Sequence, residues 1–389
     1  MQRRSSSLTG VPLAWRNLMS NKRRLARSTA GIAFAVVLVL VELGFRNAFL
    51  DSALEVIRHI DGDIVMVSAT KYRTGRKDSF SRRYLYEARA GAGVASVRPI
   101  YGNVSFWKNP EDRKNYAVSV LAFDPDQSPW TWREVNDKSA ALRQPDTVLF
   151  DSRARRFLGR AGNGTTTELG GRTVHVVGTF PLGPDFLVDG TVMTSDRNFL
   201  EMFADHPLDR SDLADVEFGV VRVEPGADIA RVQAALRRDL PPSLLVLTKA
   251  ELVAREVDFQ AKTSSVGPIF DLGAVIGFVV GMLISYQIIY TDLSDQLAQY
   301  ATLKAIGYEN RYLVRSVLQQ AALYALAGLL PAWIIAWLVY FAIGEVALLP
   351  MRLSLELAAL SAFLTMAMCL LSALVAVRRV LNADPAEVF

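Results

Sequence analysis

Four long apolar stretches divide the chain, and their spacing is uneven. A bilayer core about 30 Å thick is crossed by about 20 helical residues, so a charge-free run of that length predicts a transmembrane helix. Residues 272–291, 317–344 and 357–377 carry no charge, and residues 28–45 contain only Glu42. We predict transmembrane helices at residues 28–49, 269–291, 317–344 and 357–377, with the long polar block 50–268 inserted between the first and the second.

The first stretch has an alternative interpretation as a cleaved signal peptide, because it is the shortest and follows a basic segment. It lacks a small-residue cleavage site before Arg46 and Asn47, and the polar sequence after it continues the helical pattern. A retained membrane anchor is therefore the preferred interpretation.

Charge predicts the orientation of these helices. Residues 1–27 are rich in lysine and arginine and contain no acid, and they are typical of an interfacial helix. The loop 292–316 and the tail 378–389 lie on the same side and add Lys304, Arg311, Arg315, Arg378 and Arg379, whereas the opposite loop 345–356 has only Arg352. The positive-inside rule then places both termini in the cytoplasm and the 50–268 block outside.

The net charge of +4 does not indicate a nucleic-acid partner. Basic and acidic residues nearly balance in the 50–268 block, so the basic excess comes from the segment beside the membrane, where lipid headgroups account for it. The only cysteine, Cys369, lies in the fourth apolar stretch. The polar block is therefore expected to fold without a disulfide.

The polar block has the pattern of a mixed α+β domain. Short β-rich runs separated by Gly, Pro, Asn and Asp occur at 63–67, 94–100, 116–123, 147–150 and 173–180. A β-α-β unit follows, with strands at 216–223 and 244–247 around a helix at 228–240 that Asp228 caps. Helical patterns at both ends of the block predict stalks that lead to the first and second membrane helices.

The block offers little for catalysis. His59, His175 and His206 lack metal-ligand spacing, and the glycine-rich segment 159–171 lacks the Gly-Lys-Ser/Thr ending of a phosphate loop and is expected to be a surface turn. Acid pairs such as Asp124 with Asp126 are expected by chance in so acidic a block. We therefore predict no catalytic residue, no metal and no enzymatic activity in this chain.

The predicted membrane helices contain a row of three glycines and a pair of charged residues. Gly273, Gly277 and Gly281 recur every four residues and allow close helix approach, either to a second copy of the chain or to another helix of the same chain. Glu42 is costly in lipid, and Arg46 follows one helical turn later. We expect these two to form an intramembrane ion pair that is mainly structural.

The loop 292–316 contains a short helix with two apolar faces. Leu293, Leu297, Tyr300 and Ala301 share one face, together with Lys304, whereas Leu303 and Ile306 lie on another and Gly307 ends the helix. Such a helix can lie along the membrane by one face and dock a partner by the other. Periodicity alone is equally compatible with a simple amphipathic turn.

The sequence of this loop resembles the coupling segment of FtsX-like permeases of ABC transporters, of the MacB/LolC type. The run Tyr290-Thr291-Asp292-Leu293-Ser294-Asp295-Gln296-Leu297 and the run Tyr300-Ala301-Thr302-Leu303-Lys304-Ala305-Ile306-Gly307-Tyr308 are most similar to the DevC branch. Further matches are Pro12-Leu13-Ala14-Trp15, Ala30 to Ala35, Leu43 to Arg46, Trp107 to Pro110 and Asp384 to Glu387. Gln296, Ala298 and Gln299 replace the Arg/Glu-rich stretch of the other branches.

The resemblance implies a mechanism and a set of partners. It implies a homodimer in the bacterial inner membrane, a separate cytoplasmic ATPase that holds the ATP and Mg, a periplasmic membrane-fusion adaptor, and a TolC-like outer-membrane channel. The chain itself would carry no cofactor and would export a lipid-like or amphipathic substrate. The ATPase would be coupled through Leu297, Tyr300, Ala301, Leu303, Lys304, Ala305, Ile306, Gly307 and Tyr308.

An alternative of a different class is an FtsX-like transducer, which activates a periplasmic partner such as a cell-wall hydrolase without transporting anything. The FtsX branch typically has a much smaller outer domain, so the length of the 50–268 block favours export.

Overall fold

The computed structural model describes residues 22–71, 78–184, 188–203, 215–262 and 266–381. Its contacts divide the chain into two compact units. The first, which we call the helical domain, comprises Met1–Arg46, Pro268–Ala342 and Met351–Phe389; the second, the sheet domain, comprises Asn47–Gly267 and Ile343–Pro350. The interfacial helix predicted at 1–27 falls mostly outside the described residues.

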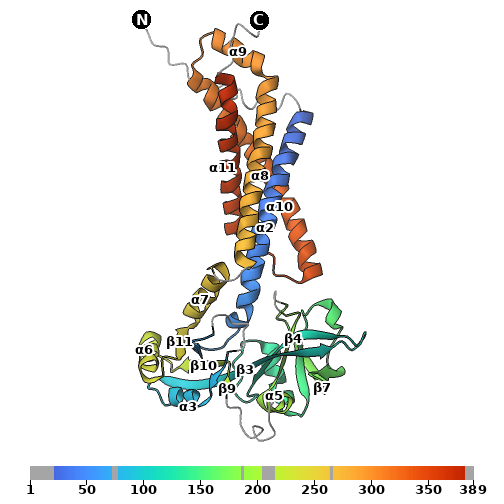
Figure 1. Ribbon diagram of the computed structural model, residues 1–389, viewed down its shortest axis with the longest axis vertical. Helices are drawn as coiled ribbons and strands as arrows, with labels where there is room; N and C mark the ends of the chain where they lie inside the picture. Colours follow the sequence, from blue (N-terminus) through green and yellow to red (C-terminus); the bar gives the residue numbers. More distant parts are fainter. Residues whose placement is uncertain (1–21, 72–77, 185–187, 204–214, 263–265, 382–389) are drawn as a thin grey trace. The chain divides into compact units, whose positions relative to one another are not determined.

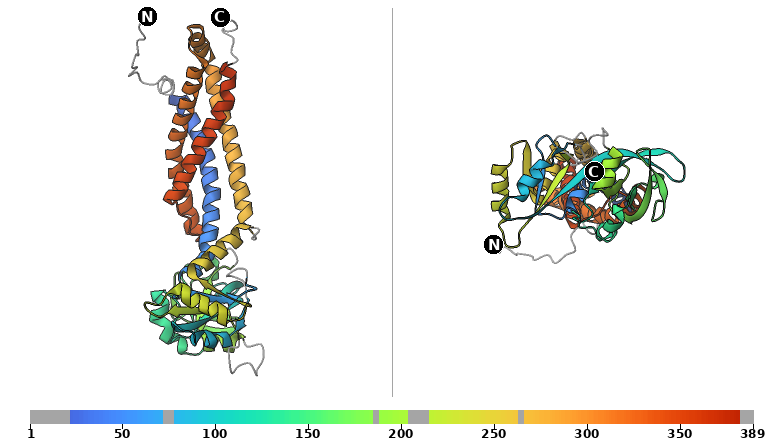
Figure 2. Two further views of the ribbon diagram at one scale, coloured as in Figure 1. Left: turned by 90° about the vertical axis from the view of Figure 1, so that its left-hand side faces the viewer. Right: turned by 90° about the horizontal axis from the view of Figure 1, so that it is seen from below.

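Four long helices carry the apolar stretches. They are α2 (Lys22–Arg58), α8 (Val266–Asp295), α10 (Asn310–Ala347) and α11 (Leu355–Leu381). Each contains a window with a mean hydropathy of 2.1 to 2.3 and is long enough to cross a membrane. Figures 1 and 2 show them side by side in the helical domain.

The helices extend beyond the apolar runs. The helix α2 continues to Arg58 and α8 to Asp295, so the loop predicted at 292–316 is shorter in the structure and contains α9 (Leu297–Ala305). Pro268 lies in the first turn of α8, where its missing N–H has no helical partner to lose.

The sheet domain is built on nine strands among the described residues, in the order β11-β1-β10-β3-β4-β8-β5-β7-β6. Their bounds are β1 Ile64–Ser68, β3 Val94–Lys108, β4 Asn115–Phe123, β5 Thr147–Asp151, β6 Thr166–Leu169, β7 Arg172–Phe180, β8 Thr191–Ser195, β10 Phe218–Val223 and β11 Leu244–Thr248. A separate pair joins β2 (Phe80–Ser81) to β9 (Asp215–Val216). The predicted fold class, four apolar helices with an inserted mixed α+β domain, is confirmed.

The first half of the sheet is a four-stranded split β-α-β arrangement. Here β1 lies between β10 and β11 and is antiparallel to both, and β10 also pairs with the first part of β3. The helix α6 (Ile229–Asp239) connects β10 to β11, and its N-terminus is capped as predicted, because the Asp228 carboxylate accepts from the Ala230 N–H at 2.9 Å. The helix α3 (Arg83–Arg89) precedes β3, and α7 (Lys249–Lys262) follows β11.

The second half closes on itself. The later part of β3 pairs with β4, and the path through β8, β5, β7 and β6 returns to β3 where Trp107 is opposite Leu169. The short helices α4 (Arg133–Lys138) and α5 (Asp196–Phe203) accompany these strands. Gly170 and Gly171, both with positive φ, form the two-residue turn between β6 and β7. The segment 159–171, expected to be a surface turn, thus also contains the strand β6, because Thr167 and Leu169 are buried against the sheet.

Trp107 marks the core of this second half. Its side chain is fully buried, it packs on Phe150 at a ring distance of 4.7 Å, and its Nε1–H donates to the Leu158 carbonyl at 3.1 Å. The indole thus fills apolar space while its one polar atom is satisfied.

The carboxyl group of Asp151 makes the stability of the sheet domain sensitive to pH. Burial raises the pKa of Asp151 from 3.8 to about 6, against the opposing effect of the backbone N–H groups of Arg153, Leu182 and Gly183 that donate to it. Between these two pH values the folded state holds a proton that the unfolded state has lost. The contribution to stability is therefore complete below about pH 4 and is lost as the pH rises through about 6.

We therefore expect the melting temperature of the full-length protein to fall more between about pH 5 and about pH 7.5 than that of Asp151→Asn, which cannot titrate there. Thermal unfolding in neutral detergent measures both. An equal fall in the two proteins would contradict the assignment.

Candidate functional site

The end of α8 leads directly into α9, and a hydrogen-bonded turn then reverses the chain into α10. The Gly307 N–H donates to the Lys304 carbonyl at 3.0 Å, and the Tyr308 N–H donates to the Leu303 carbonyl at 3.1 Å. Gly307 has φ +100, a conformation that favours glycine. This pair of bonds is the Schellman helix end, and it confirms that Gly307 ends the helix.

The two faces of α9 have different surroundings. Tyr300 and Ala301 are buried, α9 contacts α11, and Leu293 at the end of α8 is buried as well. Ile306 is 70% exposed and Tyr308 is 45% exposed. The chain itself therefore covers Tyr300 and Ala301 of the first predicted face and leaves Ile306 of the second face exposed.

Three further predicted coupling residues lie between these extremes. Leu297, Leu303 and Lys304 are half-buried. Tyr308 packs against Tyr312, with ring centroids 4.8 Å apart, and Tyr312 is 41% exposed. We define Ile306, Tyr308 and Tyr312 as the exposed patch. Tyr312 was not predicted, because it lies beyond the helix break at Gly307, where a helical wheel no longer applies.

A buried carboxylate lies just before this segment and was not among the predicted site residues. Asp292 is 2% exposed; it accepts a hydrogen bond from the Tyr324 hydroxyl and another from Gln320 Nε2 at 3.3 Å. Both donors are on α10, so the carboxylate ties the end of α8 to the first turns of α10 across the α9 segment. The available signal was an acid placed directly after a charge-free run.

The three glycines of α8 face other helices of the same chain. A Cβ at Gly273 would come within 2.6 Å of the Glu42 carboxylate, and one at Gly277 would come within 3.4 Å of Val39. At Gly281 it would meet Met368 of α11 and, at 3.2 Å, Ala35 of α2. Within the single chain this stripe packs against α2 and, at Gly281, also against α11.

The expected ion pair between Glu42 and Arg46 is not the one that forms. Arg46 Nε donates to Asp271 Oδ1 at 2.6 Å, and the Glu42 carboxylate lies against Gly273. Spacing along α2 suggested a partner one turn away, whereas the partner comes from α8. The correction follows from the close approach of α2 and α8 that the glycines permit.

The sheet domain brings no catalytic constellation together among the residues described. His175 Nδ1 and Thr166 Oγ1 are 3.0 Å apart on neighbouring strands, and His59 stacks on Trp132. No group of three or more His, Cys, Asp or Glu that could hold a metal occurs among the residues whose positions are given. His206 lies outside the described residues.

Comparison with known proteins gives two matching family models. The MacB-like periplasmic core domain matches residues 26–239, and the FtsX-like permease C-terminal region matches residues 272–385. An uncharacterized ABC transporter permease of Mycobacterium tuberculosis is 24% identical over 383 residues, which cover 97% of this chain and 98% of the relative. A second one from the same species is 23% identical over 389 residues, with the same coverage.

Two solved structures are similar to parts of the chain. The periplasmic region of MacB from Actinobacillus actinomycetemcomitans is 11% identical with a TM-score of 0.35, and covers 55% of this chain and 99% of that one. The extracellular domain of the transporter YknZ from Gram-positive bacteria is 13% identical with a TM-score of 0.33, and covers 48% and 98%.

The first family model spans more than half of the chain and the second covers most of the rest. The helices and the inserted sheet domain define a membrane-embedded transporter subunit. The chain belongs to the FtsX/MacB family of ABC transporter permeases.

Proposed function

We propose that this permease carries ATP-driven motion from a separate cytoplasmic ATPase, through α9, to the sheet domain, and so exports a lipid-like or amphipathic substrate. The observation that supports this most directly is the two-faced environment of α9. Tyr300 and Ala301 of α9 are buried within the chain, and the exposed patch begins at Ile306, directly after α9 ends. A helix fixed on one side can pass on a force that is applied on the other.

The proposal includes the partners that the family resemblance implies. These are two copies of the chain, an ATPase that holds ATP and Mg, a periplasmic adaptor and an outer-membrane channel, with both termini in the cytoplasm. Since Gly273, Gly277 and Gly281 are used within the chain, a second copy would dock elsewhere. The distribution of lysine and arginine supports the orientation.

The size of the sheet domain favours export over the transducer function. Neighbouring genes discriminate between them: an adaptor gene beside the ATPase gene supports export, and a hydrolase gene in that place supports transduction.

The exposed patch yields a direct test. Ile306→Asp places a charge on the surface that would meet the ATPase, and we expect ATPase binding and permease-stimulated ATP hydrolysis to fall by at least about tenfold. Leu303→Asp is expected to act in the same direction. Co-purification and ATP hydrolysis by the candidate ATPase, with the permease in detergent or nanodiscs, provide the measurement.

Gln299→Asp is the matched control, because Gln299 is an exposed residue of α9 outside the patch and the change adds the same charge. It should leave both quantities near the wild-type level. Unchanged binding and unchanged stimulation in both Ile306→Asp and Leu303→Asp would refute the coupling role of α9.

A further inference from the structure

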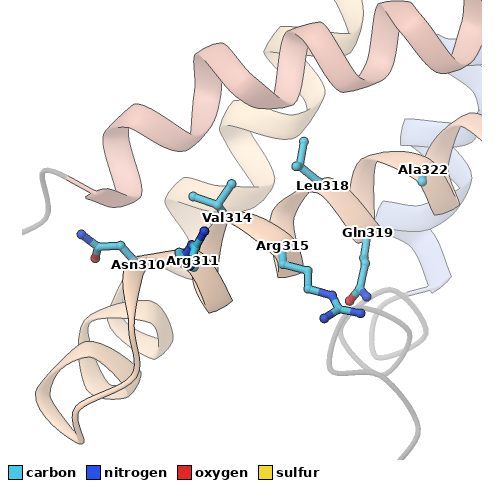
Figure 3. A pocket seen from close by; sticks show the side chains of 7 residues that line it. All are labelled: Asn310, Arg311, Val314, Arg315, Leu318, Gln319 and Ala322. Carbon is cyan, nitrogen blue, oxygen red and sulfur yellow. The ribbon is translucent and has the colours of Figure 1, made fainter.

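A groove runs along one side of the first turns of α10. Its volume of about 560 Å³ is in the range of small-molecule sites. Figure 3 shows the residues that line it, with the polar ends of Arg315 and Gln319 on one side and Val314 and Leu318 on the other. The lining residues are Asn310, Arg311, Val314, Arg315, Leu318, Gln319 and Ala322.

The two arginines of the groove are available to an anion. Arg311 and Arg315 are exposed, and among the described residues neither guanidinium forms an ion pair or a side-chain hydrogen bond, so each retains its donors. They lie four residues apart and therefore on the same face of α10, where two like charges repel each other. A bound phosphate would relieve this repulsion, and guanidinium groups match its oxygens in pairs.

The position of the groove relative to the membrane identifies the kind of anion. The membrane helix predicted within α10 begins at residue 317, so at 1.5 Å per residue Arg315 lies about 3 Å and Arg311 about 9 Å outside it. The polar headgroup layer of a bilayer is about 5–8 Å thick on each side. Leu318 and Ala322 lie inside the charge-free run, at the depth of the acyl chains. The groove therefore joins a phosphate-binding end to an apolar end.

We propose that this groove binds an anionic phospholipid of the leaflet in which α10 begins. Arg311 and Arg315 hold the phosphate, and Leu318 and Ala322 lie along an acyl chain. The inference depends on α10 spanning the membrane and not on the coupling role of α9.

Other occupants fit the groove less well. A soluble phosphate or nucleotide has no acyl chain to occupy the apolar end of the groove. The N-terminal segment 1–21 carries Arg3, Arg4 and Arg16 and no acid, so its charge is the wrong one for a site with two arginines. A protein partner would leave the apolar end, at acyl-chain depth, unfilled.

The test measures binding of phosphatidylglycerol to the purified full-length permease in neutral detergent by native mass spectrometry. Arg311→Gln and Arg315→Gln should each weaken binding by about tenfold, since each removes a charged hydrogen-bond donor. Ala322→Leu fills the apolar end without a change of charge and should also weaken binding. The melting temperature without added lipid shows whether each variant is folded.

Arg378→Gln is the charge-matched control, since Arg378 is an exposed arginine at the end of α11 and does not line the groove. It should keep most of the binding.

Four outcomes would contradict the proposal. An equal loss of binding in Arg378→Gln would indicate general surface attraction, and equal binding of phosphatidylcholine would show that the site is not specific for an anionic lipid. Full competition by inorganic phosphate would assign the groove to a free anion. Loss of ATPase binding by the Arg311→Gln/Arg315→Gln variant without phosphatidylglycerol would assign it to a protein. Each of these four outcomes overturns the proposal.

Discussion

Lys71→Met should lower the free energy of unfolding of the sheet domain by about 3–5 kcal/mol, because it leaves a buried carboxylate without its cation. Lys71 Nζ and Glu217 Oε2 are 2.5 Å apart, and the two side chains are 3% and 6% exposed. The ammonium group also lies 4.7 Å from the centre of the Phe218 ring. Urea unfolding of the full-length protein, followed by tryptophan fluorescence, gives the change.

Two variants separate this effect from general damage. Lys71→Met/Glu217→Leu replaces both charges by apolar groups and should recover most of the lost stability. Lys262→Met removes a lysine from the exposed pair with Asp258 and should cost less than about 1 kcal/mol. If the double variant were as unstable as Lys71→Met, loss of packing rather than the unpaired charge would be the cause.

Asp292→Ala should separate ATPase binding from ATPase stimulation. The change leaves the Tyr324 hydroxyl and the Gln320 amide without their acceptor, at a cost of about 1–3 kcal/mol for each buried group. The exposed patch is unchanged, so the ATPase should still bind. The link between α8 and α10 is lost, and we expect stimulation of ATP hydrolysis to fall several-fold.

Asp295→Ala serves as the control for this prediction, since Asp295 is an exposed aspartate one helical turn further along α8. It should change stimulation little. Asp292→Asn keeps one acceptor oxygen and should be intermediate between Asp292→Ala and the wild type. A parallel loss of binding and stimulation in Asp292→Ala would show that Asp292 only maintains the fold.

The long helices and several strands were predictable because their signals are local. A charge-free run identifies a helix that crosses a membrane whatever its neighbours are, and the Asp228 cap lies within two residues of the N–H that it accepts from. The strand β8, whose five residues are all buried, was not among the predicted runs. It is defined by its neighbours β4 and β5, which lie far away in sequence.

In the candidate site too, local features could be predicted and contacts between distant segments could not. The periodicity placed the buried Tyr300 and Ala301 on one face and the exposed Ile306 on another, whereas Leu303 is half-buried like Leu297, and Gly307 ended the helix as expected. Which face the chain would cover depended on α11, and the partner of Arg46 was supplied by α8, 225 residues away. Contacts of this kind depend on how distant segments pack together, and the local patterns of a single sequence do not show this.

The strand β3 belongs to both halves of the sheet domain, and this has a consequence for how the domain can change in size. Ile100, where the strand leaves the four-stranded half, is directly opposite Phe218, where the chain returns to it. The whole closed second half is thus an insertion whose two ends are neighbours, at a place where a tight turn could join them. Relatives could therefore lengthen, shorten or exchange this half while the four strands between the two stalks keep their pairing.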